Sequence, residues 1–264
     1  MHLKLGWLYP TLMGTYGDRG NVICLEKRTQ WRDITVEIIK LDQDAALETW
    51  SEVDLIVGGG AQDRQQEIVM RDLQGAKADK FKALIEDNVP GVFTCGSPQL
   101  LGKYYEPAVG QRIEGLGILD LVSKHPGFEA QRCIGNVAFE ITANPLAENL
   151  AKKLGQKAVA LGFENHGGRT YLGDVQPLGK VLTGYGNNGE DGWEGAFYKQ
   201  AIATYAHGPL LPKNPFIADW LIEKALERKY QAEIIFAPID DQLAVQARKT
   251  MFNRLNLSEL NNSA

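Results

Sequence analysis

The chain has 264 residues, a hydrophobic content of 44%, a charged content of 23% and a formal net charge of -5. These values are typical of a globular protein with a substantial core, and they exclude nucleic acid as the main partner, because phosphate binding needs clustered Lys and Arg. No apolar run approaches the ~20 residues of a membrane-spanning helix, and the N-terminus lacks the basic and apolar regions of a secretory signal. The three cysteines are an odd number without paired spacing, so we expect a cytoplasmic protein with neither disulfides nor a bound metal.

Short apolar runs and helical segments alternate in the first hundred residues. Such runs suit parallel strands that are buried on both faces of a sheet. We expect them at Leu3–Tyr9, Ile34–Leu41, Val53–Val57 and before Cys95. Helices are expected from Asn21 and over Arg64–Glu86, where Gly75 marks a break. This order predicts an α/β fold with an open, mostly parallel twisted sheet and helices on both faces.

The second half of the chain is rich in turn signals. Asn188-Gly189 and Asp191-Gly192 are typical hairpin turns, so this half should turn by hairpins. A short helix should reach Tyr105, followed by strands at Leu116–Val122, Asn136–Ile141, Ala158–Phe163, Val181–Tyr185 and Ala201–Tyr205 and by helices at Ile217–Lys229 and Asp240–Leu257. We assign residues 1–230 to one domain and residues 231–264 to a C-terminal extension with a helix, which either packs on the domain or docks a partner.

Cys95 is the leading candidate for a nucleophile. An apolar run ends at this cysteine, and Gly96, Ser97 and Pro98 follow before a segment that can form a helix. A strand-to-helix turn of this kind presents a nucleophile above the sheet, next to a backbone N–H that can bind an oxyanion. The alternative is a small buried residue at a strand end, since free cysteines are often simply buried.

A thiol needs a base or a dipole to become reactive, and two of the four histidines are suitably placed. His207 follows the strand expected at Ala201–Tyr205, so it should reach the same edge of the sheet as Cys95. His166 lies in the polar segment Glu164–Arg169, which is flexible enough to line a pocket or to form a hairpin tip. A histidine on a surface loop remains the alternative for His207.

Three consecutive glycines, Gly58, Gly59 and Gly60, follow the expected strand at Val53–Val57. Their amides are uncovered by side chains, and acyl transfer needs such donors for the developing oxyanion. A tight turn would favour glycine equally well. The glycine spacing of a dinucleotide site and the Gly-Lys-Ser/Thr ending of a P-loop are both absent from the sequence.

Together these segments resemble the class I glutamine amidotransferases, a flavodoxin-like fold, and specifically their cobyric-acid-synthase-like branch. Within that branch they are most similar to the glutaminase subunits of lipid II isoglutaminyl synthases. The resemblance runs from Leu3 to at least Lys229 and is carried by Ile56–Arg64, Phe93–Gln99, Gly162–Tyr171, Gly184–Asn188 and Tyr205–Asn214.

The resemblance implies hydrolysis of L-glutamine to glutamate and ammonia. Cys95 would attack the side-chain amide to form a glutamyl thioester, and His207 would activate the thiol and return a proton to ammonia. The oxyanion hole would be formed by the amide of Gly96 with that of Gly59 or Gly60.

Further residues are carried over from the same family. Asp18 matches an acidic residue near the histidine, and the resemblance implies a role for it in catalysis. The residues implied to bind the substrate are Gln99, Arg132, Asn165 and His166. Pro209 stands where many class I enzymes have the acidic residue of a His-x-Glu motif, and Ser97-Pro98 also departs from the common elbow sequence.

Such glutaminases supply ammonia to a second subunit. The resemblance implies a heterodimer with a Mur-ligase-like, MurT-type subunit, which would bind ATP and Mg and amidate the α-carboxyl of D-glutamate in peptidoglycan synthesis. No cofactor is expected in this chain. The alternatives are a glutaminase for corrinoid or other amidation, a non-catalytic regulatory scaffold of a ligase, and a cysteine hydrolase of related fold.

Overall fold

The computed structural model describes residues 1–15 and 17–257, so residues 258–264 of the predicted C-terminal extension lie outside the described part. The helices in that part are α1 Arg19–Gln30, α2 Leu47–Trp50, α3 Asp63–Asp72, α4 Ala76–Glu86, α5 Gly96–Leu101, α6 Leu146–Leu154, α7 Leu210–Lys213, α8 Pro215–Tyr230 and α9 Gln242–Arg254. The strands are β1 His2–Leu8, β2 Thr35–Leu41, β3 Leu55–Gly58, β4 Gly91–Thr94, β5 Tyr104–Glu106, β6 Ile113–Glu114, β7 Leu121–Lys124, β8 Cys133–Ile141, β9 Val159–His166, β10 Arg169–Leu172, β11 Gly179–Thr183, β12 Trp193–Glu194, β13 Ala196–Tyr198 and β14 Ala201–Thr204.

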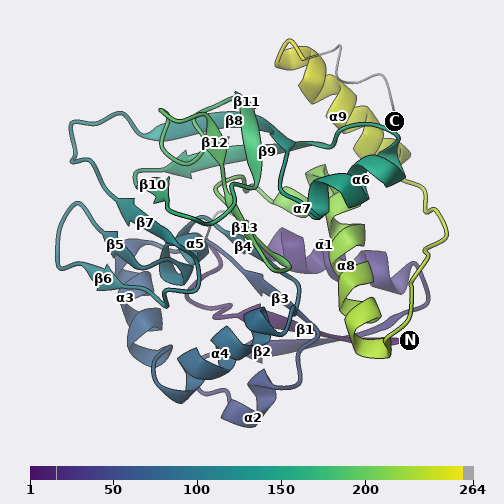
Figure 1. The fold of residues 1–264 in the computed structure, drawn as a ribbon, viewed down its shortest axis with the longest axis horizontal. Coiled ribbons are helices and arrows are strands. Elements are labelled where there is room, and N and C mark those ends of the chain that lie inside the picture. The colour runs from purple at the N-terminus through teal and green to yellow at the C-terminus, as the bar shows by residue number, and fades with distance from the viewer. Residues whose placement is uncertain (16, 258–264) are drawn as a thin grey trace.

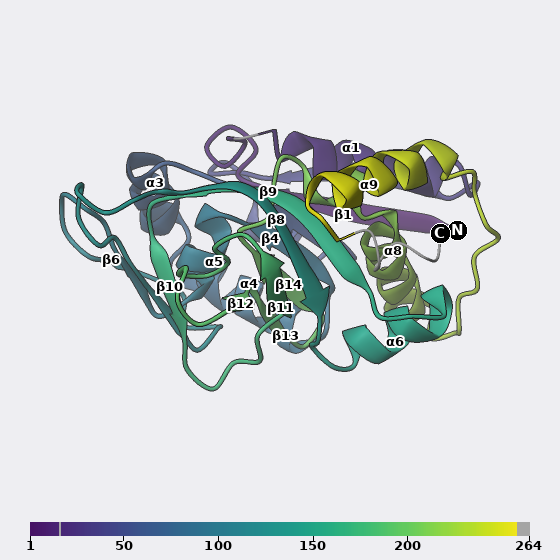
Figure 2. The ribbon, with the colours of Figure 1, turned by 90° about the horizontal axis from the view of Figure 1, so that it is seen from above.

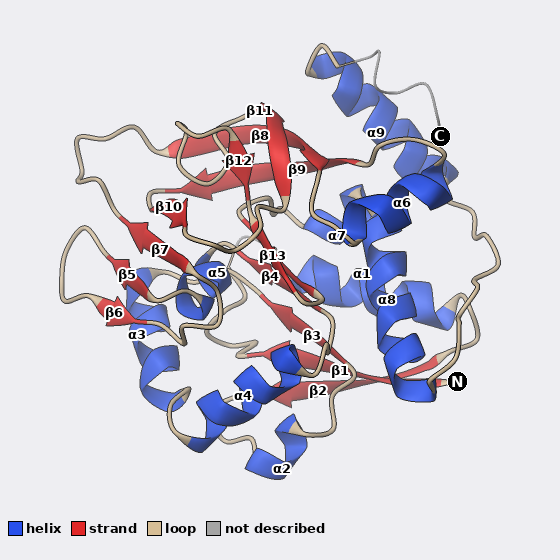
Figure 3. Cartoon of the chain, viewed as in Figure 1, coloured by secondary structure: helices blue, strands red, loops and turns tan. Residues whose placement is uncertain are grey.

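A six-stranded sheet forms the centre of the fold, with the strand order β13-β14-β4-β3-β1-β2 (Figure 1). All neighbouring strands in it are parallel except β13 and β14, which form an antiparallel pair. The α/β fold with an open, mostly parallel sheet is therefore confirmed. In Figure 3 the arrows of β1, β2 and β3 point toward the side where β5, β6 and β7 lie.

The short central strands are buried on both faces because each apolar run alternates its side chains between two cores. Leu55, Val57 and Val92 pack into a cluster with residues of α1 and α8. Ile56 and Phe93, which point the other way, pack with residues of α2, α3 and α4. Helices therefore cover both faces of the sheet.

The second half of the chain builds two four-stranded sheets, β10-β7-β5-β6 and β12-β11-β8-β9. The strand β9 is tied to the central sheet, since Phe163 and His207 exchange two backbone hydrogen bonds of 3.0 Å. Figure 2 shows α6 beside α8, and Leu146 and Leu150 of α6 pack into the same cluster as Trp220.

Two apolar segments form a different structure from the one expected from the sequence. The helix at Cys95 ends at Leu101, and Tyr104–Glu106 forms β5 instead of continuing that helix. The strand expected at Leu116–Val122 begins only at Leu121, because the amides of Leu116, Gly117 and Ile118 bond to the carbonyls of Leu100, Gly102 and Leu101. These bonds satisfy orphan carbonyls at the end of α5.

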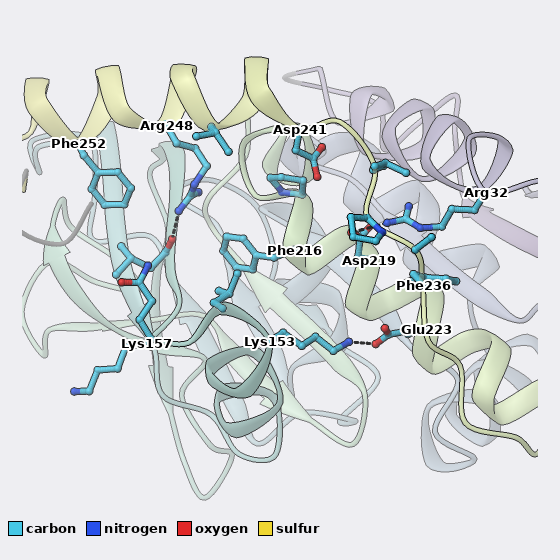
Figure 4. Close-up of a pocket in the computed structure, with 18 residues that line it drawn as sticks. Arg32, Lys153, Lys157, Phe216, Asp219, Glu223, Phe236, Asp241, Arg248 and Phe252 are labelled. Carbon is cyan, nitrogen blue, oxygen red and sulfur yellow. Dashed lines mark hydrogen bonds and ion pairs between the residues drawn. The ribbon is translucent and has the colours of Figure 1, made fainter. Parts of the chain in front are cut away.

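The C-terminal extension lies over β8 and β9. Phe252 of α9 is 3% exposed and packs with Ala138, Val159 and Leu161. Arg248 donates to the Val159 carbonyl at 2.7 Å. A cavity of about 430 Å³ lies beneath this part of the chain, and it is lined by residues of α6, α8 and α9 (Figure 4).

Candidate active site

Cys95 lies at a sharp turn between β4 and α5. Its backbone angles are φ 54° and ψ -100°, which a residue with a side chain rarely adopts. The turn is held because the Cys95 amide donates to the Thr204 carbonyl of the neighbouring strand at 2.9 Å. Strained turns of this kind expose a nucleophile at the carboxyl end of a strand.

His207 follows the strand next to that of Cys95. The parallel strands β4 and β14 pair with Thr94 opposite Thr204, so Cys95 and His207 lie one and three residues beyond the same register position. The two backbone bonds to Phe163 fix the His207 segment, and the imidazole is 1% exposed. The structure therefore places both predicted catalytic residues at one edge of the sheet.

Burial dominates the protonation of both groups. The pKa of the Cys95 thiol is raised to about 12, mainly by burial and in part by the Asp18 carboxylate, while Arg132 and the Gly96 amide oppose the rise. The pKa of His207 is lowered to about 4, mainly by burial and in part by the charges of His166, Lys213 and Arg132. At neutral pH the resting pair is an uncharged thiol and an uncharged imidazole, which can accept a proton.

Asp18 lies against the glycine turn. Its Oδ2 accepts a hydrogen bond from the Gly60 amide at 2.7 Å, and the residue is 2% exposed. Burial raises the pKa of its carboxyl to about 6, opposed by the bond from Gly60 and by the charge of Lys213. The Gly60 amide, one of the two expected oxyanion donors from this turn, is thus already engaged.

The neighbouring Gly59 has no room for a side chain. A Cβ at this position would lie 2.2 Å from the Met13 carbonyl oxygen and 3.1 Å from the Cβ of Asp18. The Gly59 carbonyl accepts from the Ser97 hydroxyl at 2.7 Å, which ties the glycine turn to the start of α5. The elbow and the glycine turn therefore form one packed unit.

Gln99 belongs to a buried chain of hydrogen bonds. Its Oε1 accepts from Gln66 at 2.8 Å, and its Nε2 donates to the Tyr205 hydroxyl at 3.1 Å. That hydroxyl also bonds to Thr170 at 2.7 Å. Both polar atoms of the Gln99 amide thus contact protein groups, and its predicted contact with substrate stays a prediction.

Arg132, Asn165 and His166 lie together at the start of β8 and the end of β9. Arg132 donates to the side-chain and backbone oxygens of Asn165 at 2.5 and 3.0 Å, so Asn165 orients the guanidinium. His166 is 3% exposed, because β9 continues through it instead of ending at Phe163 as expected. Its Nδ1 donates to the Gly168 carbonyl at 2.8 Å, and its ring stacks on Tyr205 with 3.8 Å between centroids.

Sequence reasoning missed two acidic residues near the site. Asp63 begins α3 and accepts a hydrogen bond from the Tyr105 hydroxyl at 3.2 Å. Glu194 is fully buried, and its Oε1 accepts from the Thr204 hydroxyl at 2.5 Å and the Tyr205 amide at 2.7 Å. Asp63 could have been recognised from the sequence because it closely follows the three glycines, whereas no neighbouring residues mark Glu194.

Over residues 1–15 and 17–257, no cluster of three or more His, Cys, Asp or Glu side chains forms a candidate metal site. In that same part of the chain, no helix is both long and apolar enough to cross a membrane. The cavity of Figure 4 is lined by none of the predicted site residues, so it is separate from the cysteine elbow.

A nucleophile elbow, a histidine on the next parallel strand and a glycine turn define a glutaminase-like α/β enzyme. Residues 4–215 match the CobB/CobQ-like glutamine amidotransferase domain, so the chain belongs to this family and is a glutamine amidotransferase.

The relatives narrow the comparison. The chain is 39% identical to the lipid II isoglutaminyl synthase (glutamine-hydrolyzing) subunit GatD of Staphylococcus aureus (strain N315), over 92% of each chain. It is 36% identical to the subunit of the same name from Streptococcus pneumoniae (strain ATCC BAA-255 / R6), over 92% of this chain and 87% of that one. A probable cobyric acid synthase of Methanothermobacter thermautotrophicus is 26% identical over 72% of this chain but only 38% of its own length.

Solved structures support the fold. PurLQS from Thermotoga maritima superposes with a TM-score of 0.58 at 13% identity, covering 88% of this chain and 100% of that chain. The glutaminase domain of Trypanosoma brucei CTPS with bound acivicin has a TM-score of 0.53 at 12% identity, covering 89% of this chain and 96% of that one. At these identities the likeness bears on the fold alone.

Proposed function

We propose that this chain is the glutaminase subunit of a lipid II isoglutaminyl synthase. It hydrolyses L-glutamine and delivers ammonia to a Mur-ligase-like, MurT-type subunit, which uses ATP and Mg to amidate the α-carboxyl of D-glutamate in lipid II. Two relatives with that name, each matched over 92% of this chain, support the assignment. The observation that carries the glutaminase step is the placement of Cys95 and His207 at the ends of two neighbouring parallel strands.

The reaction uses the uncharged resting pair. As the Cys95 sulfur attacks the side-chain carbonyl carbon of glutamine, His207 takes the thiol proton and the carbonyl oxygen becomes an oxyanion. The amides of Gly59 and Gly96 are the donors we assign to that oxyanion, because Asp18 engages the amide of Gly60. His207 then returns the proton to the departing nitrogen, which leaves ammonia and a glutamyl thioester.

Hydrolysis of the thioester repeats the sequence with water. His207 takes a proton from water as the oxygen attacks the thioester carbonyl. As the C–S bond breaks, His207 returns that proton to the departing sulfur, which releases glutamate and restores the thiol. Asp18 acts on the glycine turn, so it is a positioning residue in this scheme. Asn165 has the same kind of role toward Arg132, to which we assign binding of the substrate carboxylate.

A glutaminase for corrinoid amidation is the second candidate. The relatives that favour it are the probable cobyric acid synthases, which match at 25–26% identity and over 33–38% of their own length. A regulatory scaffold without catalysis would not require the cysteine elbow and the histidine, and both are in place.

The test is glutamate release from L-glutamine by the full chain, alone and with the Mur-ligase-like subunit, beside Cys95→Ala. Turnover should vanish in the variant while circular dichroism stays unchanged. With ¹⁵N-amide glutamine, lipid II should gain the label only in the complex with intact Cys95. The Cys95→Ala complex supplied with ammonium chloride should still amidate lipid II, whereas label transfer in that variant would refute the proposal.

A further inference from the structure

Asp63 lies in the loop that packs against the nucleophile. Ala61, two residues before it, approaches the elbow so closely that a Cβ on Gly96 would be 3.0 Å from the Ala61 nitrogen. Asp63 then starts α3, and its side chain bonds to Tyr105 at 3.2 Å. The carboxylate therefore belongs to the surroundings of Cys95, although no catalytic role was assigned to it.

A turn of two glycines connects Asp63 with Arg132. A Cβ on Gly168 would lie 3.4 Å from a ring carbon of Tyr105, the residue that bonds to Asp63. A Cβ on Gly167 would lie 2.6 Å from Nε2 of His125 and 3.3 Å from Nη1 of Arg132. Arg132 and the partner of Asp63 thus both pack against this turn, and glycine is needed there because a Cβ would collide with neighbouring side chains.

Their charges are not neutralised by neighbours. Among the residues that the structure describes, neither Asp63 nor Arg132 forms an ion pair within 4.0 Å. The charges of both groups also act on the thiol, since Asp63 raises the pKa of Cys95 and Arg132 lowers it, although burial is the main cause of its shift. A free amino acid carries the complementary pair of charges on one carbon.

We infer that Asp63 binds the α-ammonium group of glutamine, opposite the α-carboxylate at Arg132. This inference rests on the proposed function and extends it to specificity, because it makes the site select a free amino acid over other carboxamides. The competing explanation is that Asp63 only stabilises the N-terminus of α3 through the helix dipole.

Glutaramate, which is glutamine without the α-amino group, separates these explanations. We expect Asp63→Asn to lower kcat/KM for L-glutamine about 10–100-fold, mainly through KM, as for loss of a hydrogen bond to a charged group. The value for glutaramate should stay within about twofold. Asp79→Asn is the matched control, because Asp79 is an exposed acid in the first turn of α4. Asp79→Asn should leave kcat/KM unchanged for both substrates.

Equal losses on both substrates, or no loss on glutamine, would overturn the inference, and so would a lowered melting temperature without a change in selectivity. If the wild-type chain releases no glutamate, binding of both compounds to the Cys95→Ala protein is measured by calorimetry. If Asp63→Asn then weakens the binding of glutamine but not that of glutaramate, the assigned role of Asp63 is supported even though the chain shows no hydrolysis. Unchanged binding, or no binding of glutamine at all, would refute it.

Discussion

The Asp18 carboxylate accepts a hydrogen bond from the Gly60 amide, with 2.7 Å between Oδ2 and nitrogen. This bond gives Asp18 two effects on the site that can be separated by mutation. It fixes the glycine turn through an acceptor oxygen, and it places a negative charge near the Cys95 thiol, whose pKa it raises in addition to the effect of burial.

Asp18→Asn should retain the first effect and remove the second, because an amide oxygen still accepts from Gly60. We expect the pH profile of Cys95 alkylation by iodoacetamide to move to lower pH in this variant. Glutamate release should fall much less than in Asp18→Ala, which loses the acceptor as well. Equal losses in the two variants would show that the charge, and not the hydrogen bond, is what the reaction needs.

Gly59→Ala should damage the site more than its size suggests. The added Cβ would lie 2.2 Å from the Met13 carbonyl oxygen, a backbone atom that cannot move without shifting the loop. We expect a loss of stability of about 1–3 kcal/mol in urea unfolding, as is typical of overpacking. Glutamate release should fall at least 10-fold even where the variant is fully folded, because the oxyanion donor moves with the loop.

Ala61→Gly is the control for Gly59→Ala, since it changes the same loop without adding an atom. It should retain most of the activity. A Gly59→Ala protein with wild-type turnover would exclude the Gly59 amide from the oxyanion hole.

Because His207 is the base, we expect the decline of kcat/KM at acid pH to occur at an unusually low pH. Burial lowers its pKa to about 4 from an ordinary value of 6.5, so the imidazole remains a base well below pH 6. We expect kcat/KM for glutamine to decline near pH 4–5, measured as glutamate release in a buffer series. A decline centred near pH 6.5 would mean that His207 is not buried in the working enzyme.

The same shift contributes to stability with a defined sign. Because the unfolded chain binds the His207 proton more readily, this group favours the native state fully above pH 6.5, and the contribution is lost as pH falls toward 4. His207→Gln should therefore weaken the loss of stability between those values. The raised pKa of Asp18 acts in the opposite direction, so the variant must be compared with wild type at each pH.

The site residues that could be predicted are those that their immediate neighbours in the sequence mark. Cys95 and the glycine turn end apolar runs, so their places at strand ends could be read from a few neighbouring residues. Predicting the place of His207 also required the pairing of β14 with β4. Glu194 supports the strand before His207 through a bond to Thr204, and its two-residue strand gives no pattern to recognise.

The fold could be predicted wherever the burial of a strand alone determines the pattern of apolar residues. The central strands are apolar runs because both faces are covered, whereas Leu116–Leu119 is apolar for another reason. Its amides bond to the end of α5, so apolar character there marks packing against a helix end rather than a strand. Contacts between distant segments decide whether such an apolar run forms a strand, and the spacing of apolar residues carries no information about those contacts.

The C-terminal extension is anchored by one buried arginine. Arg28 of α1 is 3% exposed and forms paired bonds of 2.6 and 2.8 Å with Asp219 of α8 and with Asp241, just before α9. Asp241→Asn removes one of its two counter-charges and leaves Asp219 in place. We expect α9 to exchange its amide hydrogens faster and the protein to lose about 1–2 kcal/mol of stability, whereas Arg28→Met should cost about 3–5 kcal/mol.

Hydrogen exchange followed by mass spectrometry is the measurement, with Glu233→Gln as the control because Glu233 is exposed and lies in the same extension. Glutamate release by Asp241→Asn should stay at the wild-type level, since α9 lies over β8 and β9 and not at the elbow. Unchanged protection of α9 in Asp241→Asn would show that Phe252 and Arg248 hold the helix without the ion pair. Reduced transfer of ammonia to lipid II in the same variant, with normal glutamate release, would instead support docking of the Mur-ligase-like subunit on the extension.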